Sequence, residues 1–163
     1  MERITLQAPN QGSLKPRDAA RIKEKIRTLG GVKSVNIRIT PSHIEIDMVA
    51  SRDTVEKIEG LLGPLHPPPA GDPWSLARKQ MFWQAHEILE EEWRRTRDPR
   101  IEAAIKAMAA LAKAQEGNLE AALRIASRIP PDTGIDRRCV EEMATRAYQG
   151  HEADILECIG GHP

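Results

Sequence analysis

A histidine and four glutamates lie close together in the middle of the chain, within residues 86–92. His86 and Glu90 are four residues apart, so on a helix their side chains would share one strip of surface. Such a pair can hold a divalent metal ion or act as a general acid and base, with Glu87 assisting. The spacing His-Glu-x-x-Glu is similar to the His-Glu-x-x-His of zinc metalloproteases, but the second histidine is missing.

The same residues have a structural interpretation, which the sequence leaves open. His86 would then be a helix-packing residue whose ring bonds a carboxylate or a backbone carbonyl, and Trp93 would belong to the core. We therefore predict no metal or other cofactor, with a divalent metal ion held by His86 and Glu90 as the alternative. That alternative needs further ligands from another helix, because two residues are too few for zinc. Four other histidines have no assigned place: His43, His66, His151 and His162.

Other patterns for catalysis are not found in the sequence. It contains no Ser-His-Asp or Cys-His arrangement, no phosphate-binding loop and no dinucleotide fingerprint. Cys139 and Cys158 form neither a CxxC pair nor a zinc pattern, and we expect both to remain reduced thiols. No signal peptide or apolar membrane span is evident, so we expect a cytoplasmic protein without membrane association. Lys and Arg number 24, as do Asp and Glu, so the strong basic field of a phosphate-binding protein is not expected.

The residues that surround His86 and Glu90 follow the spacing of an amphipathic helix. Apolar residues recur every three or four positions between Trp74 and Trp93, which predicts a helix from Asp72 to about Arg97. An aspartate followed by proline marks its start, and the same device recurs at residues 98–99. Further helices are predicted at 99–116, 119–129, 136–149 and 151–159. Residues 74–163 are thus predicted to form a helical bundle.

Residues 1–63 have a different pattern, in which strands and helices alternate. Apolar and polar residues alternate at 35–39 and at 44–48, and Thr40-Pro41-Ser42 between them predicts a hairpin turn. A strand at 3–6, a helix at 16–29 and a helix after Ser51 complete a β-α-β-β-α order. We predict an α+β protein with a ferredoxin-like N-terminal module, a proline-rich linker at 64–73 and the helical bundle.

The N-terminal half resembles the heavy-metal-associated domains of copper chaperones at residues 19–35. That family binds metal through a CxxC in the first loop, whereas this loop is Ala8-Pro9-Asn10-Gln11-Gly12-Ser13, so metal transport is rejected. No aromatic residue precedes Trp74, which removes the stacking surface that RNA binding on a sheet requires. Nucleic acid is therefore not an expected partner. If a fourth strand is absent, an open sheet edge would invite pairing with another copy.

A second resemblance covers the helical half. The run Ala85-His86-Glu87-Ile88-Leu89-Glu90-Glu91 with Trp93, an Ala-rich helix and the turn Gly117-Asn118-x-x-Ala121-Ala122 are similar to a family of small helical proteins. These proteins are grouped as a domain of unknown function, number three-zero-nine. The match spans roughly residues 76–130. The resemblance implies an all-helical bundle and supplies candidate residues, but it implies no reaction.

Glu92 departs from this family, in which the position is usually apolar. The helical spacing places Glu92 near the centre of the apolar face, between Ala85 and Leu89. A carboxylate there needs a cation, a proton or a wet cavity. Lys106 and Arg124 are the two candidate cations.

These observations favour a non-catalytic binding or assembly module over an enzyme. The turn at 116–123 is similar to that of a tetratricopeptide repeat, and such helical hairpins offer grooves to peptides or to other subunits. We predict ligand contact near His86, Glu87, Glu90, Glu92 and Trp93, with a homo-oligomer or another protein as the partner. The alternative is a metal-dependent hydrolase that uses His86 and Glu90 with ligands from another helix.

Overall fold

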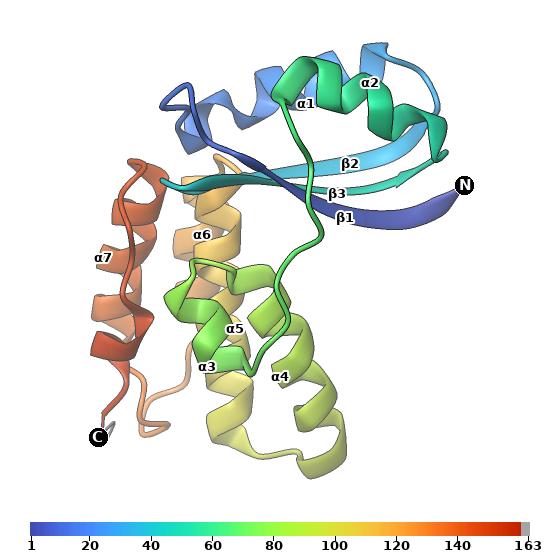
Figure 1. Cartoon of the computed structure of the whole chain (residues 1–163). Helices are drawn as coiled ribbons and strands as arrows, with labels where there is room; N and C mark the ends of the chain where they lie inside the picture. Colours follow the sequence, from blue (N-terminus) through green and yellow to red (C-terminus); the bar gives the residue numbers. More distant parts are fainter. Residues whose placement is uncertain (161–163) are drawn as a thin grey trace.

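The computed structural model describes residues 1–160 and has the predicted mixed α+β class. The N-terminal part is a three-stranded sheet with helices on one face, and the rest of the chain is helical (Figure 1). His162 and the end of the C-terminal tail lie outside the described residues. The N-terminal elements are β1 (Glu2–Pro9), the 3-10 turn η1 (Pro16–Asp18), α1 (Ala19–Thr28), β2 (Val32–Ile39), β3 (His43–Ala50) and α2 (Asp53–Leu62).

The sheet is antiparallel and has the strand order β1-β3-β2. One face is apolar, as the alternation predicts, and its side chains are buried in the same core as those of α1 and α2; Ile4, Ile37 and Ile46 represent the three strands. Because side chains alternate along a strand, the intervening residues project from the opposite face. These residues are largely polar: Arg3, Thr5, Gln7, Arg38, Glu45 and Asp47.

A fourth strand is reduced to a single bridge beside β1. The Gln7 N–H donates to the carbonyl of His66 at 2.7 Å, and the His66 N–H donates to the carbonyl of Gln7 at 2.9 Å. Continuing this antiparallel pairing would place Pro68 opposite Thr5, and proline has no N–H to donate. The linker therefore cannot complete the sheet. The β-α-β-β-α order is confirmed, and the ferredoxin-like description stays an interpretation of it.

The helical part is built around a central helix, α5. This helix packs against α4, α6 and α7, and residues on nearly all its sides are buried, among them Ala107, Met108, Leu111 and Ala114. Within the described residues, no helix combines the length and apolar character needed to cross a membrane. The elements are α3 (Pro73–Arg78), α4 (Phe82–Thr96), α5 (Pro99–Gln115), α6 (Leu119–Ala126), α7 (Arg137–Tyr148) and the 3-10 turn η2 (Ile155–Cys158).

The single helix predicted from Asp72 to Arg97 is wrong, because the chain breaks between α3 and α4. Gln80 lies at the break in a left-handed backbone conformation, with φ of 65°. Its buried side-chain amide donates to the carbonyl of Ala153 at 3.0 Å and accepts from the Ala153 N–H at 2.8 Å. Its own carbonyl accepts from the Gln115 side chain at 2.9 Å. These long-range bonds stabilise a break that helical spacing does not reveal.

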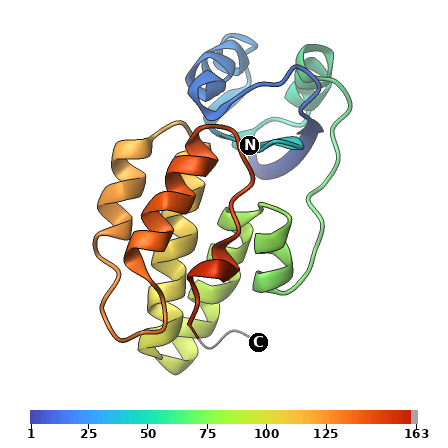
Figure 2. The same cartoon turned by 90° about the vertical axis from the view of Figure 1, so that its left-hand side faces the viewer.

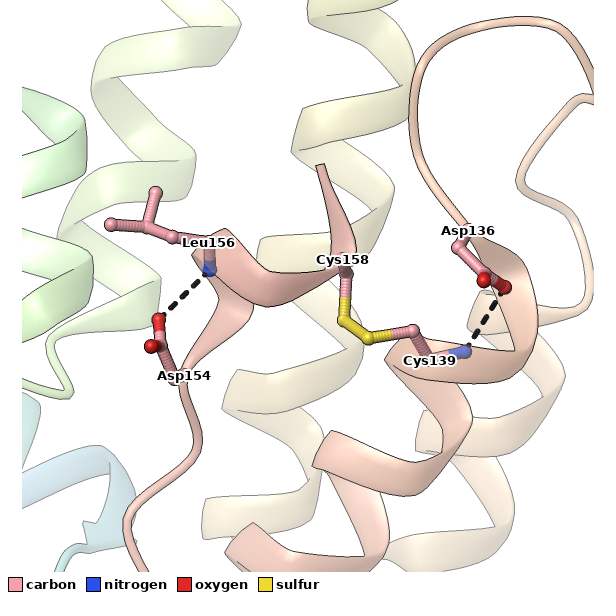
Figure 3. The surroundings of a disulfide bond; sticks show 5 residues. All are labelled: Asp136, Cys139, Asp154, Leu156 and Cys158. Atoms are coloured by element: carbon pink, nitrogen blue, oxygen red, sulfur yellow. Dashed lines mark hydrogen bonds between the residues drawn. A yellow bond between two sulfur atoms is a disulfide. The ribbon is translucent and has the colours of Figure 1, made fainter. Parts of the chain in front are cut away.

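The helix predicted at 151–159 is also wrong, since only the short turn η2 forms there. The prediction of two reduced thiols fails at the same place. Cys139 in α7 and Cys158 in η2 form a disulfide, with their Cα atoms 5.3 Å apart (Figure 3). The chain returns beside α7 and brings together two cysteines 19 residues apart. Disulfides are rare in cytosolic proteins, so this bond does not support the expected cytoplasmic location.

The polar face of the sheet meets the helical part (Figures 1 and 2). The views show α1 and α2 above the sheet and the bundle below it. The C-terminal end of α5 lies against β2, and η1 contacts α7. The approach is close at Gly117, where a side chain would place its Cβ 2.4 Å from the carbonyl oxygen of Pro16. The sheet therefore has two covered faces.

Candidate functional site

α4 carries all five residues predicted to contact a ligand. Phe82, Ala85 and Leu89 bury its inner face in the helical core. His86 and Glu90 lie one turn apart at the edge of that face, as their spacing predicts. Their closest atoms, Nδ1 and Oε2, are 3.9 Å apart, which is too far for a hydrogen bond. The two side chains are neighbours without a direct bond.

His86 is packed between the two parts of the molecule. Its ring stacks on that of Trp83, with centroids 4.5 Å apart and an angle of 11° between the planes. Its side chain is 13% exposed. Burial lowers the pKa of His86 below its usual value, and Arg38 adds to this effect, while Glu90 and Glu87 act in the opposite direction. The imidazole is therefore neutral at neutral pH.

The remaining predicted residues on this helix have charged neighbours. Glu87 accepts from the guanidinium of Arg3 at 2.7 Å, so α4 is tied to β1. Glu90 accepts from Arg94 at 3.3 Å, within the same helix. Trp93 is half-buried, and the guanidinium of Arg97 lies 4.3 Å from the centre of its ring. These contacts place Glu87 and Glu90 on the side of α4 that leads to the sheet.

Glu92 lies apart from that side. It is half-buried and lines an open surface hollow with Ile88, Glu91, Arg94 and Arg95, so the predicted position near the centre of the apolar face is wrong. Neither of the two candidate cations pairs with it. Lys106 pairs with Glu102 at 3.5 Å, and Arg124 pairs with Glu120 at 3.8 Å.

Sequence reasoning missed a buried charge network under the sheet. Its centre is Arg38 of β2, which is 2% exposed. The guanidinium donates to Glu45 on the adjacent strand, to Asp47 at 3.3 Å and to Glu116 at the end of α5 at 3.2 Å. Arg3 reaches the same Asp47 at 3.2 Å from β1. All three strands and the central helix thus meet in one set of ion pairs.

The charges of this network stabilise one another. Burial disfavours the charged form of Arg38, but the carboxylates of Glu45, Glu116 and Asp47 outweigh it and raise the pKa of Arg38. Burial likewise acts to raise the pKa of Asp47, yet bonds and charges from Arg3 and Arg38 outweigh it and lower that pKa. Arg38 and Asp47 therefore stay ionised at neutral pH.

Two residues connect this network to the strip on α4. The side-chain amide of Gln84 donates to Glu45. Trp83 lies beside Arg38, whose guanidinium carbon is 5.3 Å from the ring centre, and the same ring stacks on His86. A continuous line of contacts thus runs from Arg38 through Trp83 to His86.

One sequence signal pointed to part of this network. The turn at residues 40–42 predicts a hairpin, and its register sets Arg38 opposite Glu45 as an opposite-charge pair. That register is compatible with a solvent-exposed polar face, and the amphipathic alternation suggests such a face. Nothing in the local pattern indicates that Glu116, 78 residues after Arg38, covers the pair.

A surface cleft opens between β1 and α4, next to the network. We call it the β1–α4 cleft; its volume is about 520 Å³. Ile88 exposes 36% of its surface here, a large value for an apolar side chain. The cleft contains both signs of charge as well as apolar surface. Its lining is Arg3, Trp83, Glu87, Ile88, Glu90, Glu91 and Arg94.

α4 also concentrates buried polar atoms that lack a hydrogen-bond partner among the described residues. Four of the six such side-chain atoms belong to this helix: Trp83 Nε1, Gln84 Oε1, His86 Nδ1 and Trp93 Nε1. Buried polar groups are nearly always bonded, so these four atoms mark α4 as the helix with the least satisfied polar groups among the described residues.

Comparison with known proteins finds one family model that is similar to the region around this helix. Residues 73–125 match the model of a domain of unknown function (DUF309). The DUF309 match runs from α3 into α6 and contains every predicted contact residue, together with Glu116. It does not contain Arg3, Arg38, Glu45 or Asp47. No curated protein and no solved structure matches the chain.

The DUF309 helices do not assemble an evident metal site. Among residues 1–160, no group of three or more His, Cys, Asp or Glu side chains is placed to hold a metal ion. His86 and Glu90 are a pair without a third such ligand beside them in that part of the chain. The geometry offers instead a neutral imidazole stacked on Trp83, whose ring lines the β1–α4 cleft.

Proposed function

We propose that this protein is a non-catalytic assembly module that associates with a protein surface, first of all that of a second copy, through the β1–α4 cleft. The observation that carries the proposal is the cleft itself, where Ile88 exposes 36% of its surface beside Trp83 and two ion pairs. A partner surface can bury Ile88 and exclude water from the cleft.

The chemistry of the cleft supports a protein partner over a small charged ligand. Arg3 and Arg94 are each already paired with a carboxylate, Glu87 and Glu90, so the cleft has no concentrated charge of one sign. Ile88 adds exposed apolar surface between them. Aromatic and apolar centres with a polar rim are typical of protein interfaces.

Self-association of the purified protein tests this proposal. Sedimentation or light scattering should show association that increases with protein concentration. The variant Ile88→Asp removes apolar contact at the cleft and should weaken association at least about tenfold, since burying an isoleucine contributes about 1.5–3 kcal/mol. Leu61→Asp is the matched control, because Leu61 is similarly exposed, at 39%, but lies on α2 above the sheet.

Three results would contradict the proposal. One is association that Ile88→Asp and Leu61→Asp weaken equally, and another is a chain that stays monomeric throughout. The third is stoichiometric bound metal that disappears in His86→Ala. That third result would favour the metal-dependent hydrolase, with His86 and Glu90 as two of its ligands.

A further inference from the structure

The outer edge of β1 offers backbone groups to a neighbour. Gln7 directs both its N–H and its carbonyl away from β3, toward His66. Alternate residues of an antiparallel strand point their backbone groups the same way, so those of Arg3 and Thr5 also face outward. Between residues 1 and 160, no backbone hydrogen bond to these outward groups is present. Four strong hydrogen-bonding groups are therefore open at this edge.

The other edge of the sheet is protected by two devices that β1 lacks. In β2 the register is broken by a bulge between Val32 and Ser34, and the exposed Lys33 lies at that bulge. Bulges and edge lysines oppose pairing with another chain. The pairing of β1 is unbroken from Glu2 to Pro9. The charge of Arg3 does not protect the edge, because its side chain is held by Asp47 and Glu87.

Two exposed apolar side chains belong to the start of β1 or to the cleft beside it. Three large apolar residues are exposed in the described part of the chain: Met1, Leu61 and Ile88. Met1 precedes the first residue of β1, and Ile88 lines the β1–α4 cleft. Open backbone groups and exposed apolar surface thus coincide at this edge, which is the combination that strand addition uses.

We propose that two copies of this chain pair their β1 strands antiparallel, so that two three-stranded sheets form one continuous sheet. This inference rests on the proposed function and names its partner and its geometry. In the pairing, Arg3 of each copy lies opposite Thr5 of the other, and both pairs exchange N–H···O bonds. The two copies are related by a two-fold axis that passes near Ile4.

The register follows from the residues at the edge. Setting Arg3 opposite the same residue of the second copy would place like charges face to face, which is destabilising. Setting Thr5 opposite its equivalent would bring Arg3 to the second copy's Gln7, whose outward groups already bond His66. The intermediate register avoids both conflicts and uses all four open groups. Arg3, which takes part in this pairing, also lines the β1–α4 cleft.

Hydrogen–deuterium exchange of the unmodified chain tests the pairing directly. The amides of Arg3 and Thr5 should become protected as the protein concentration rises. The amides of Glu2, Ile4 and Leu6, which face β3, should be protected at every concentration and serve as the internal control. Exchange at Arg3 and Thr5 that does not depend on concentration would overturn the inference.

A matched pair of variants provides the second test. Thr5→Pro removes the outward N–H of residue 5 while leaving the bonds to β3, and it should weaken self-association roughly tenfold or more. Thr5→Val also loses the hydroxyl bond to Asp47 but keeps the N–H, so it should associate like the parent chain. Equal association of the two variants, both folded by circular dichroism, would refute strand pairing.

The outcomes separate this inference from the proposed function. If Ile88→Asp weakens association and Thr5→Pro does not, the cleft assembles by another geometry, and only the inference falls. If both variants weaken association while Leu61→Asp and Thr5→Val do not, both statements are supported. A chain that is monomeric at all concentrations would contradict both the proposed function and the strand pairing.

Discussion

Arg38 shows how much one residue can determine in this structure. It is the buried cation against which three carboxylates are set, and these come from strand β3 and from the end of α5. Burying such a group is costly, and a buried ion network is weak evidence for stability as such. Removing one member of the network is nevertheless strongly destabilising, because the remaining charges stay buried without a partner. Arg38 therefore acts mainly to fix how the helical part docks on the sheet.

We predict that Arg38→Met lowers the free energy of unfolding by about 3–5 kcal/mol, because Glu45, Asp47 and Glu116 lose their shared cation. Urea unfolding measured at neutral pH checks this value. Arg21→Met is the control, since Arg21 forms only an exposed ion pair with Asp18 and should change stability by less than about 1 kcal/mol. Similar losses of unfolding free energy in both variants would mean that the buried ion pairs stabilise the fold no more than an exposed pair does.

The pH dependence of this loss follows from the direction of the pKa shift. The pKa of Asp47 is lower in the folded chain than its ordinary value of 3.8, so the network contributes its full stability above that pH. As the pH falls through the folded pKa, Asp47 takes up a proton and the contribution is lost. The difference between the parent chain and Arg38→Met should therefore shrink below about pH 4.

At the scale of elements, the sequence predicts the bounds of a helix well where residues at its own two ends begin and terminate it. The aspartate–proline pair at residues 98–99 and the Gly117-Asn118 turn set α5 at Pro99–Gln115, within one residue of the sequence expectation. The break at Gln80 and the short η2 were missed, because each depends on contacts with distant residues. The sequence left open whether a fourth strand forms; the structure has only a single bridge at His66, and the prolines after it give the reason.

The turn after α5 also carries the contact between the two parts, which leads to a prediction about Gly117. Gly117→Ala places a Cβ 2.4 Å from the carbonyl of Pro16, so it should destabilise the chain by more than the backbone conformation alone costs. Gly30→Ala is the matched control, because Gly30 has a similar φ of 80° but no atom within 4 Å of the added Cβ. We expect Gly30→Ala to cost about 1–2 kcal/mol and Gly117→Ala distinctly more in thermal or urea unfolding. Equal losses would mean that the chain relieves this contact without cost.

At the scale of the whole molecule, the candidate site belongs to neither part alone. The strip on α4 was predicted because its residues lie on one helix, where spacing determines which side chains meet. The partners Arg3 and Arg38 were not predicted, because they come from strands and no local pattern specifies which helix a sheet face will meet. The DUF309 match likewise covers helices of the second part and leaves out the strands. The docking of the two parts is what the sequence pattern did not reveal.

The disulfide makes the position of α4 depend also on the C-terminal segment. Removal of this disulfide gives the last prediction. Cys139–Cys158 holds η2 against α7, and the adjacent Ala153 bonds Gln80, which sets the start of α4. Replacing both cysteines by serine, or reducing the bond, should lower the free energy of unfolding by about 3 kcal/mol for a loop of this length. Loss of order should begin at the C-terminal segment and then reach the break before α4.

Hydrogen exchange distinguishes this path from a uniform loss of stability. In the reduced chain, the Ala153 amide, which donates to Gln80, should lose protection before the amides of the buried strand β3. The N–H of Met81, which bonds Leu76 at the same break, should follow Ala153. Simultaneous loss at Ala153, Met81 and β3 would show that the disulfide stabilises the molecule as a single unit. It would then have no local role in positioning the helix that carries His86 and Glu90.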